Sequence, residues 1–282
     1  MISTNDQRIY LVPSAGAVTD LTLDLYKLDS RTAAITLNAD VDYLYIGTSL
    51  PFNHRWFEIE TANAVASVPK VEIYFANAWK EAVDILDRTE SGGVSFAGSE
   101  NLEFTPNKDK GWDTEQDSTD ITELENAPIT YNKYWMRISF SANVSFTLKY
   151  VGQKYSNDAD LYRKYPVFRS TTLKNSWESG KADWEEQHFE AADALITDLI
   201  RRRIIWDRNQ VLDIALLQEP AVQMCATIIF RGLGANRNPK QLEDAEAQYK
   251  MATDIKQWKT DVNANAQLDP VERKISTIFL TR

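Results

Sequence analysis

The pattern of apolar positions changes once along the chain, near residue 152. Up to that point apolar residues mostly alternate with polar ones, which is the period of a half-buried β-strand. From Asp183 to Lys259 they recur every three or four residues, which is the period of an amphipathic helix. The sequence therefore predicts an α+β fold: an N-terminal antiparallel β-sandwich (1–152), a connecting segment (153–182), and a C-terminal α-helical bundle with a tail (183–282).

Short alternating stretches are the basis for the predicted β-sandwich. Residues 21–28, 41–47 and 71–76 each carry apolar side chains at every second position, which places these side chains on one face. The clearest unit is Tyr134–Phe140 followed, after a three-residue turn, by Val144–Tyr150, which predicts an antiparallel hairpin with one dry face. Several short strands with turn signals between them and no helical period are typical of a sandwich.

Three predicted helices follow one another in the C-terminal part. Asp183 and Glu186 fit a capping box at the start of the first helix. Pro220 opens the second helix at a first-turn position, and Gly232 ends it. The pair Asn238 and Pro239 begins the third. Because the second helix is apolar nearly all round, it is expected to be the buried one, with the third packed against it.

The connecting segment 153–182 is polar but rich in aromatic residues. A free linker has no use for so many large apolar rings, so we expect the segment to pack on a domain or on a neighbouring subunit. Its five large aromatics are Tyr155, Tyr162, Tyr165, Phe168 and Trp177.

Composition excludes some classes of function. The 282 residues carry a formal net charge of −10, which argues against binding nucleic acid by neutralising phosphates. The basic cluster Arg201, Arg202 and Arg203 suits the end of a helix, where the dipole favours cations, and a contact with DNA is the alternative. No apolar stretch reaches the length of a membrane span and no signal peptide is recognised, so we expect the chain to stay in the compartment where it is made.

Motifs for catalysis are missing from the sequence. The two histidines, His54 and His188, do not pair in sequence with a nucleophile motif. No phosphate-binding loop, dinucleotide fingerprint or zinc-spaced cysteine cluster is present, and the single cysteine, Cys225, lies in the most apolar helix. The sequence therefore predicts a protein that is not an enzyme and needs no cofactor.

One stretch after the third helix has the spacing of a calcium loop. Ala266 stands where such loops have glycine and Pro270 interrupts the exit, so the preferred interpretation is a polar turn without metal. The candidate ligands are Asp261, Asn263, Asn265, Gln267, Asp269 and Glu272.

The order of the three helices resembles a known family. The strings "DWEEQHFEAADALITDLIRRRIIW" and "LLQEPAVQMCATIIFRGLG", followed by the charged "EDAEAQYKMATDIKQW", are similar to the helical head–tail adaptor (connector) proteins of tailed bacteriophages. The resemblance covers roughly the last hundred residues. It implies a ring, commonly of twelve copies, that sits beneath the portal protein and leads the DNA channel to a tail or neck protein.

Further expectations follow from this resemblance. The chain would be made in the host cytoplasm and end in the neck of the virion, with DNA passing through without specific binding and with no membrane contact. Adaptors of this kind reach the portal with terminal segments, so the apolar residues Ile278, Phe279 and Leu280 are predicted to bind the portal. A strand or turn folded back on the same subunit is the alternative for this tail.

Two rival functions stay open, and the N-terminal part would carry the first of them. The string "IYFANAWKEAVDILDRT" is similar to one in β-sandwich modules of phage virion proteins, with Ala78 where a glycine is usual. Trp79, Trp112 and Trp135 are candidate sugar platforms, so a carbohydrate-binding or receptor-binding virion module is the alternative function. Their other interpretation is as core or interface aromatics. A glycosidase-like enzyme that uses two of the many acids is a second rival.

Overall fold

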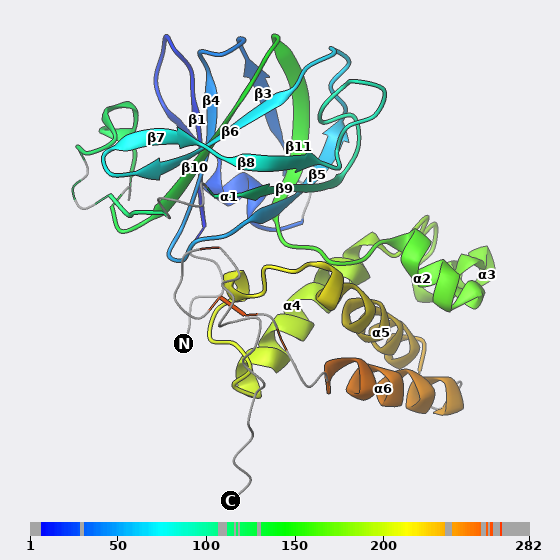
Figure 1. Cartoon of the computed structure of the whole chain (residues 1–282). Coiled ribbons are helices and arrows are strands. Elements are labelled where there is room, and N and C mark those ends of the chain that lie inside the picture. Colours follow the sequence, from blue (N-terminus) through cyan, green and yellow to red (C-terminus); the bar gives the residue numbers. More distant parts are fainter. Residues whose placement is uncertain are drawn as a thin grey trace, which may run out of the picture. The chain divides into compact units, whose positions relative to one another are not determined.

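The chain folds into two compact units (Figure 1). The computed structural model describes residues 7–28, 31–106, 112–115, 117, 119–128, 131–234, 239–254, 258, 260, 261 and 266. The N-terminal unit comprises the described residues up to Gly152 together with Asp261 and Ala266, and the helical unit comprises those from Gln153 to Thr260. Strands dominate the first unit and helices the second, so the class is α+β, as predicted.

Two antiparallel sheets make up most of the N-terminal unit. In spatial order, the first sheet is β2 (Thr19–Asp20), β1 (Arg8–Val12), β4 (Tyr43–Thr48), β10 (Tyr134–Phe140), β6 (Pro69–Phe75) and β7 (Ala78–Glu81). The second is β3 (Ala33–Leu37), β11 (Val144–Gly152), β5 (His54–Thr61), β9 (Glu100–Thr105) and β8 (Val83–Asp87). A short 3-10 helix, η1 (Thr122–Leu124), lies in the chain between β9 and β10.

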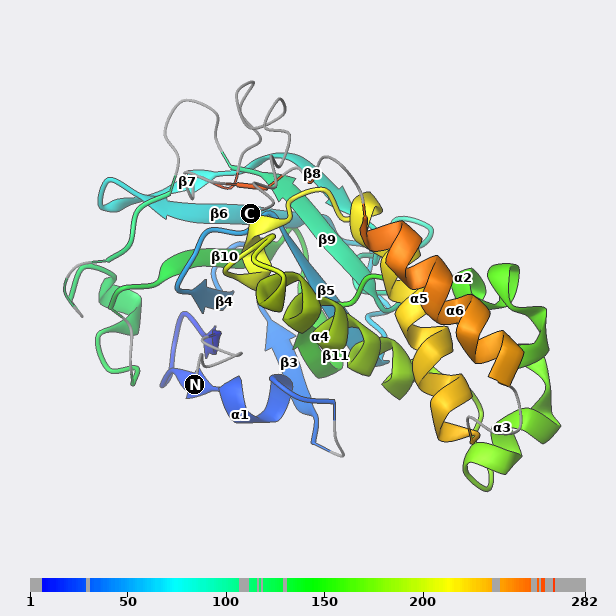
Figure 2. The ribbon, with the colours of Figure 1, turned by 90° about the horizontal axis from the view of Figure 1, so that it is seen from below.

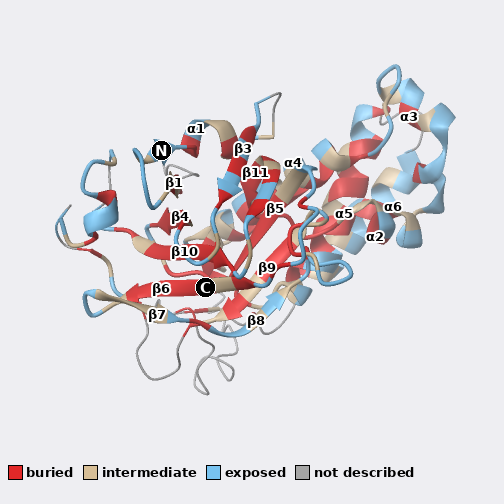
Figure 3. Ribbon diagram, turned by 90° about the horizontal axis from the view of Figure 1, so that it is seen from above, coloured by how far each residue is buried: buried red, intermediate tan, exposed pale blue. Residues whose placement is uncertain are grey.

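One hydrophobic core takes side chains from both sheets, and the central strands are coloured as buried in Figure 3. Alternation along β3 is strict, with its first, third and fifth residues buried, so β3 has the expected two-residue period. The core includes Ile9, Ile35, Leu44, Phe57, Val71, Phe96, Leu102, Met136, Phe140 and Phe146.

The predicted hairpin of Tyr134–Phe140 and Val144–Tyr150 is wrong in its pairing. Both strands form, as β10 and β11, but β10 pairs with β4 and β6 in the first sheet while β11 pairs with β3 and β5 in the second. The turn between them crosses from one sheet to the other. Alternation fixes which side chains face the core, here Phe140 and Phe146 with ring centroids 5.9 Å apart, but it does not identify the neighbouring strand.

Residues 21–28 also differ from the prediction of a strand. They begin with a single helical turn, α1 (Thr22–Leu25). Leu21 and Leu25 are buried four residues apart on the same face of that turn, while Leu23 is 68% exposed. The spacing of leucines at every second position fits four-residue spacing equally well, which explains the error.

The string from Ile73 onwards does contain a tight hairpin. Strands β6 and β7 pair with Phe75 opposite Ala78, so only Ala76 and Asn77 form the turn. Both have positive φ, 51° and 57°, as a two-residue turn of this kind requires. The turn therefore forms with alanine and asparagine, although glycine meets this requirement more readily.

The helical unit contains more helices than predicted. In chain order these are α2 (Asp158–Lys164), η2 (Pro166–Arg169), α3 (Thr171–Trp177), α4 (Glu185–Arg201), η3 (Arg208–Gln210), α5 (Ala215–Gly232) and α6 (Pro239–Thr253). None of the helices in the described ranges combines the length and the apolar run that crossing a bilayer requires.

Residues 153–182 contain three of these helices, α2, η2 and α3, and pack against α5. Leu161 of α2 and Phe168 of η2 are fully buried in one cluster with residues of α5, including Cys225 and Phe230. The many aromatics of this segment therefore serve the core of the helical unit, which agrees with the expectation that they pack.

The boundaries of the three predicted helices need correction. Helix α5 begins at Ala215, five residues before Pro220, so Pro220 lies inside the helix and does not open it. Helix α6 begins at Pro239, as expected, but ends at Thr253 and not at Lys259. Helix α4 begins at Glu185, and the carboxylate of Asp183 accepts a hydrogen bond from the Glu185 amide at 3.1 Å.

Candidate functional site

A groove of about 740 Å³ lies in the helical unit between α4, α5 and α6. These three helices lie side by side in Figure 2, with α5 packed against both of the others. The residues along the groove are Glu190, Asp193, Ala194, Thr197, Asp198 and Arg201 of α4, Met224, Thr227, Ile228 and Arg231 of α5, and Glu246 and Tyr249 of α6.

The groove follows from the composition of α5. This helix is apolar on most of its circumference, so it needs more cover than two amphipathic helices supply. One face is buried against α2, η2 and α4, while Met224 and Ile228 remain only partly buried along the groove. The α4 side uses residues three or four apart, which share one face of that helix. An apolar floor between two polar walls results.

The charges on the groove walls are mostly paired. Arg201 pairs with Asp198 at 2.6 Å, Arg231 with Glu246 at 2.7 Å, and Asp193 with Arg208 at 3.3 Å. Tyr249 also donates a hydrogen bond to Asp198 at 2.8 Å. Glu190 is exposed and makes no ion pair within the described residues, so the walls carry an excess of negative charge.

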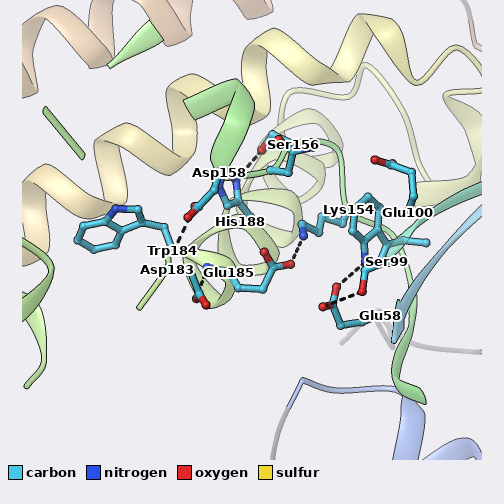
Figure 4. Close-up of polar contacts among 12 residues, drawn as sticks. Glu58, Ser99, Glu100, Lys154, Ser156, Asp158, Asp183, Trp184, Glu185 and His188 are labelled. Atoms are coloured by element: carbon cyan, nitrogen blue, oxygen red, sulfur yellow. Dashed lines mark hydrogen bonds and ion pairs between the residues drawn. The ribbon is translucent and has the colours of Figure 1, made fainter. Parts of the chain in front are cut away.

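A second polar constellation is enclosed in the helical unit (Figure 4). The hydroxyl of Ser156 lies 2.8 Å from Nδ1 of His188, and Nε2 of His188 lies 3.3 Å from the carboxylate of Asp158. The same carboxylate accepts hydrogen bonds from the Trp184 amide at 3.2 Å and from the hydroxyl of Tyr162. These hydrogen bonds lower the pKa of Asp158 below its ordinary value against the effect of burial.

This order of groups is that of a Ser-His-Asp triad, with the two ring nitrogens exchanged. An ionised Asp158 accepts from Nε2–H, which leaves Nδ1 to accept the proton of Ser156. Catalysis by such a set requires that a substrate reach the hydroxyl. Ser156 is 3% exposed and His188 fully buried, so the arrangement in this structure instead ties the start of α2 to α4.

A buried ion pair lies next to this network. Lys154, itself almost fully buried, pairs with Glu185 at the start of α4 (Figure 4). Burial lowers the pKa of His188, the positive charge of Lys154 lowers it further, and the hydrogen bond to Asp158 opposes both. His188 is therefore neutral in the folded protein near pH 7.

The stability of the helical unit is expected to decrease as the pH falls below about 6.5. The pKa of His188 is lower in the folded than in the unfolded state, so the unfolded state binds the proton first. The contribution of His188 is complete above the unfolded pKa and is lost as the pH falls towards the folded pKa. Hydrogen exchange of the α5 amides, followed between about pH 7.5 and about pH 5, measures this loss of stability.

The control for this prediction is His188→Gln, in which the pH dependence should largely disappear; an unchanged slope would contradict it. The measurement must be specific to α5 because groups in the N-terminal unit also titrate. Burial lowers the pKa of His54 to about 3, whereas burial raises the pKa of Glu115 to about 7. The effect of Glu115 has the opposite sign, since its stabilising effect is lost as the pH rises from about 4.5 to about 7.

The basic cluster lies where α4 ends. Arg201 is exposed and pairs with Asp198, and Arg202 pairs with Asp254 at 2.9 Å. Arg203 follows with a positive φ of 60° and makes no ion pair with any described residue. Two of the three cations thus have acidic partners in their own unit.

The three tryptophans considered as sugar platforms belong to the core of the N-terminal unit. Trp112 and Trp135 are buried. Trp79 is half-buried, and the guanidinium of Arg137 lies 4.4 Å from its ring centroid and 4.1 Å from that of Tyr43. A stacked sugar needs an open ring face. The interpretation as core aromatics therefore agrees with their burial, and the carbohydrate-binding hypothesis stays a prediction.

Most of the remaining predicted site residues lie outside the described part of the chain. This holds for the tail residues Ile278, Phe279 and Leu280. Of the calcium-loop candidates only Asp261 is described; its carboxylate accepts a hydrogen bond from the amide of Ala266, which has a φ of 56°. The other candidates, Asn263, Asn265, Gln267, Asp269 and Glu272, lie outside. Within the described residues no three His, Cys, Asp or Glu side chains gather as metal ligands do.

Sequence reasoning missed both the groove and the buried network. The apolar circumference of α5 was the available signal for the groove. His188 lies on the buried face of α4, but its partners are Ser156 and Asp158, in the segment expected to be a connection. The sequence "SNDAD" contains a signal for a helix there, since Asn157 and Asp160 form a capping box at the start of α2.

Comparisons with known proteins do not identify the chain. No family model and no curated protein matches it. A structural comparison finds CpGH89 from Clostridium perfringens, in complex with its substrate GlcNAc-alpha-1,4-galactose, at a TM-score of 0.26 and 11% identity. The match covers 70% of this chain and 20% of that chain, so this chain spans about a fifth of its length. A TM-score this low does not indicate a shared fold, and the function of that protein says nothing about this chain.

Proposed function

We propose that the chain is a structural virion protein, a head–tail adaptor of a tailed bacteriophage that assembles as a ring beneath the portal. The observation that carries this proposal is the open groove along α4, α5 and α6. It lies in the helices whose sequences resemble the adaptor family, and its floor presents apolar side chains of α5. An apolar face of this kind is typical of a surface that another chain covers.

The finer architecture fits the same proposal. The two sheets form a β-sandwich around their shared core, and the helices form a bundle that is the body of the ring. By resemblance the ring has about twelve copies and encloses the DNA channel. The segment with Ile278, Phe279 and Leu280 binds the portal, and the opposite side of the ring meets a tail or neck protein. The role is one of assembly, without catalysis or a cofactor.

A truncated chain tests the proposed function. Removing residues 275–282 is expected to leave the ring and its stability unchanged but to abolish attachment to DNA-filled heads that carry a portal. Binding is measured by co-sedimentation with heads purified without their neck proteins. The control exchanges only the polar Ser276 and Thr277 for alanine, which should leave attachment intact. Normal attachment of the truncated chain would contradict the portal contact.

A further inference from the structure

An exposed tryptophan follows the basic cluster at the end of α4. Trp206 is 57% exposed, and tryptophan is one of the residue types in which binding hot spots are enriched. Its neighbours hold it firmly. Ile205 is buried in the core of the helical unit, and the Trp206 amide donates to the side chain of Gln210 at 2.7 Å. Trp206 is therefore presented to solvent by a fixed turn.

The same turn carries a positive charge that has no ion-pair partner among the described residues. Arg203 is exposed in the left-handed region, and the Ile204 amide closes the helix end by donating to the Leu199 carbonyl at 3.0 Å. Arg203 has no acidic partner within the described residues, unlike Arg201 and Arg202. We call residues Arg203–Trp206 the Trp206 turn. It presents a cation and an indole three residues apart.

The groove is chemically complementary to the Trp206 turn. Its floor includes Met224 and Ile228, which suit an indole, and its volume of about 740 Å³ is larger than this side chain needs. Of the acidic residues that line the groove, Glu190 on the α4 wall is the one that makes no ion pair with a described residue. Trp206 is not among the residues that line the groove of its own chain. The Trp206 turn and the groove are thus two different surfaces of one unit.

We propose that the Trp206 turn of one copy binds in the α4–α5–α6 groove of the next copy, with Trp206 on the apolar floor and Arg203 paired with Glu190. Contact between two different surfaces is head-to-tail, and repetition of such a contact closes into a ring when the rotation allows it. The inference rests on the proposed function in that it assigns the contact between neighbouring subunits of the ring.

Charge reversal in the full-length chain tests this contact. Glu190→Arg and Arg203→Glu are each expected to weaken self-association about tenfold or more, because each places like charges together. The double variant should restore association, because it recreates the pair in reverse. Trp206→Ala should weaken association by about 10- to 100-fold. Association is measured by light scattering and analytical ultracentrifugation over a range of protein concentrations.

Matched controls separate the contact from general effects. Glu243→Arg changes an exposed acid of α6 that does not line the groove, and Tyr131→Ala removes an exposed aromatic of the N-terminal unit; neither should affect association. Thermal unfolding verifies that each variant is folded. Rings that persist in all three single variants, or a double variant no better than the singles, would overturn this contact while leaving the adaptor proposal standing. A wild-type chain that stays monomeric throughout would overturn both.

Discussion

Replacing Phe168 with alanine is expected to lower the free energy of unfolding of the helical unit by about 3–5 kcal/mol. Phe168 is fully buried, and its ring lies 4.8 Å from that of Phe230 in α5 and 5.8 Å from that of Trp184. The indole of Trp184 also donates a hydrogen bond to the Phe168 carbonyl at 2.9 Å. Alanine would leave a cavity where η2, α4 and α5 meet.

The adjacent residue provides the control for Phe168. Val167 lies in the same 3-10 helix but is 52% exposed, so Val167→Ala should change stability by less than about 0.5 kcal/mol. Hydrogen exchange of the α5 amides under increasing denaturant reports on the helical unit alone. All variants are compared at the same protein concentration, because assembly also stabilises the folded chain. A small effect of Phe168→Ala would mean that residues 153–182 are not part of this core.

Replacing Asp158 with alanine is expected to destabilise the helical unit by about 2–4 kcal/mol. The carboxylate accepts hydrogen bonds from three groups, the Trp184 amide, the Tyr162 hydroxyl and Nε2 of His188. Alanine leaves these donors without their acceptor, and His188 is too deeply buried to use water instead.

Two further variants calibrate the loss at Asp158. Asp158→Asn retains an acceptor oxygen and should be less harmful than alanine. Asp254→Ala removes an exposed carboxylate that pairs with Arg202 and should reduce stability by less than about 1 kcal/mol. The same exchange measurement in α5 compares all three variants. Equal effects of Asp158→Ala and Asp254→Ala would show that the buried network contributes nothing.

Periodicity predicted the class of the fold but not the pairing of its strands. Strands β6, β10 and β11 lie close to the alternating stretches that predict them, because alternation reports which side chains meet the core. Which strands pair in a sheet depends on contacts between residues that are distant in the sequence. The turn at residues 141–143 therefore looked like that of a hairpin, although it carries the chain from one sheet to the other.

Local signals were also ambiguous in the helical unit. Pro220 is a good first-turn residue, but the apolar residues before it, including Leu217, extend α5 to Ala215. The segment 153–182 has too many polar residues for strong helical periodicity, and tertiary contacts of Leu161 and Phe168 stabilise its short helices. The candidate site is the feature least predictable from the sequence, because the groove and the contacts of His188 form only when segments distant in the sequence pack together.

The mass and shape of the purified full-length particle test the central claim most directly. Electron microscopy combined with a solution mass measurement is expected to reveal closed rings of about twelve copies with a central channel. The rings should persist on dilution to micromolar concentration and in moderate salt, because the groove contact is largely apolar. A monodisperse monomer under these conditions, or open aggregates without a fixed number of copies, would contradict the adaptor account.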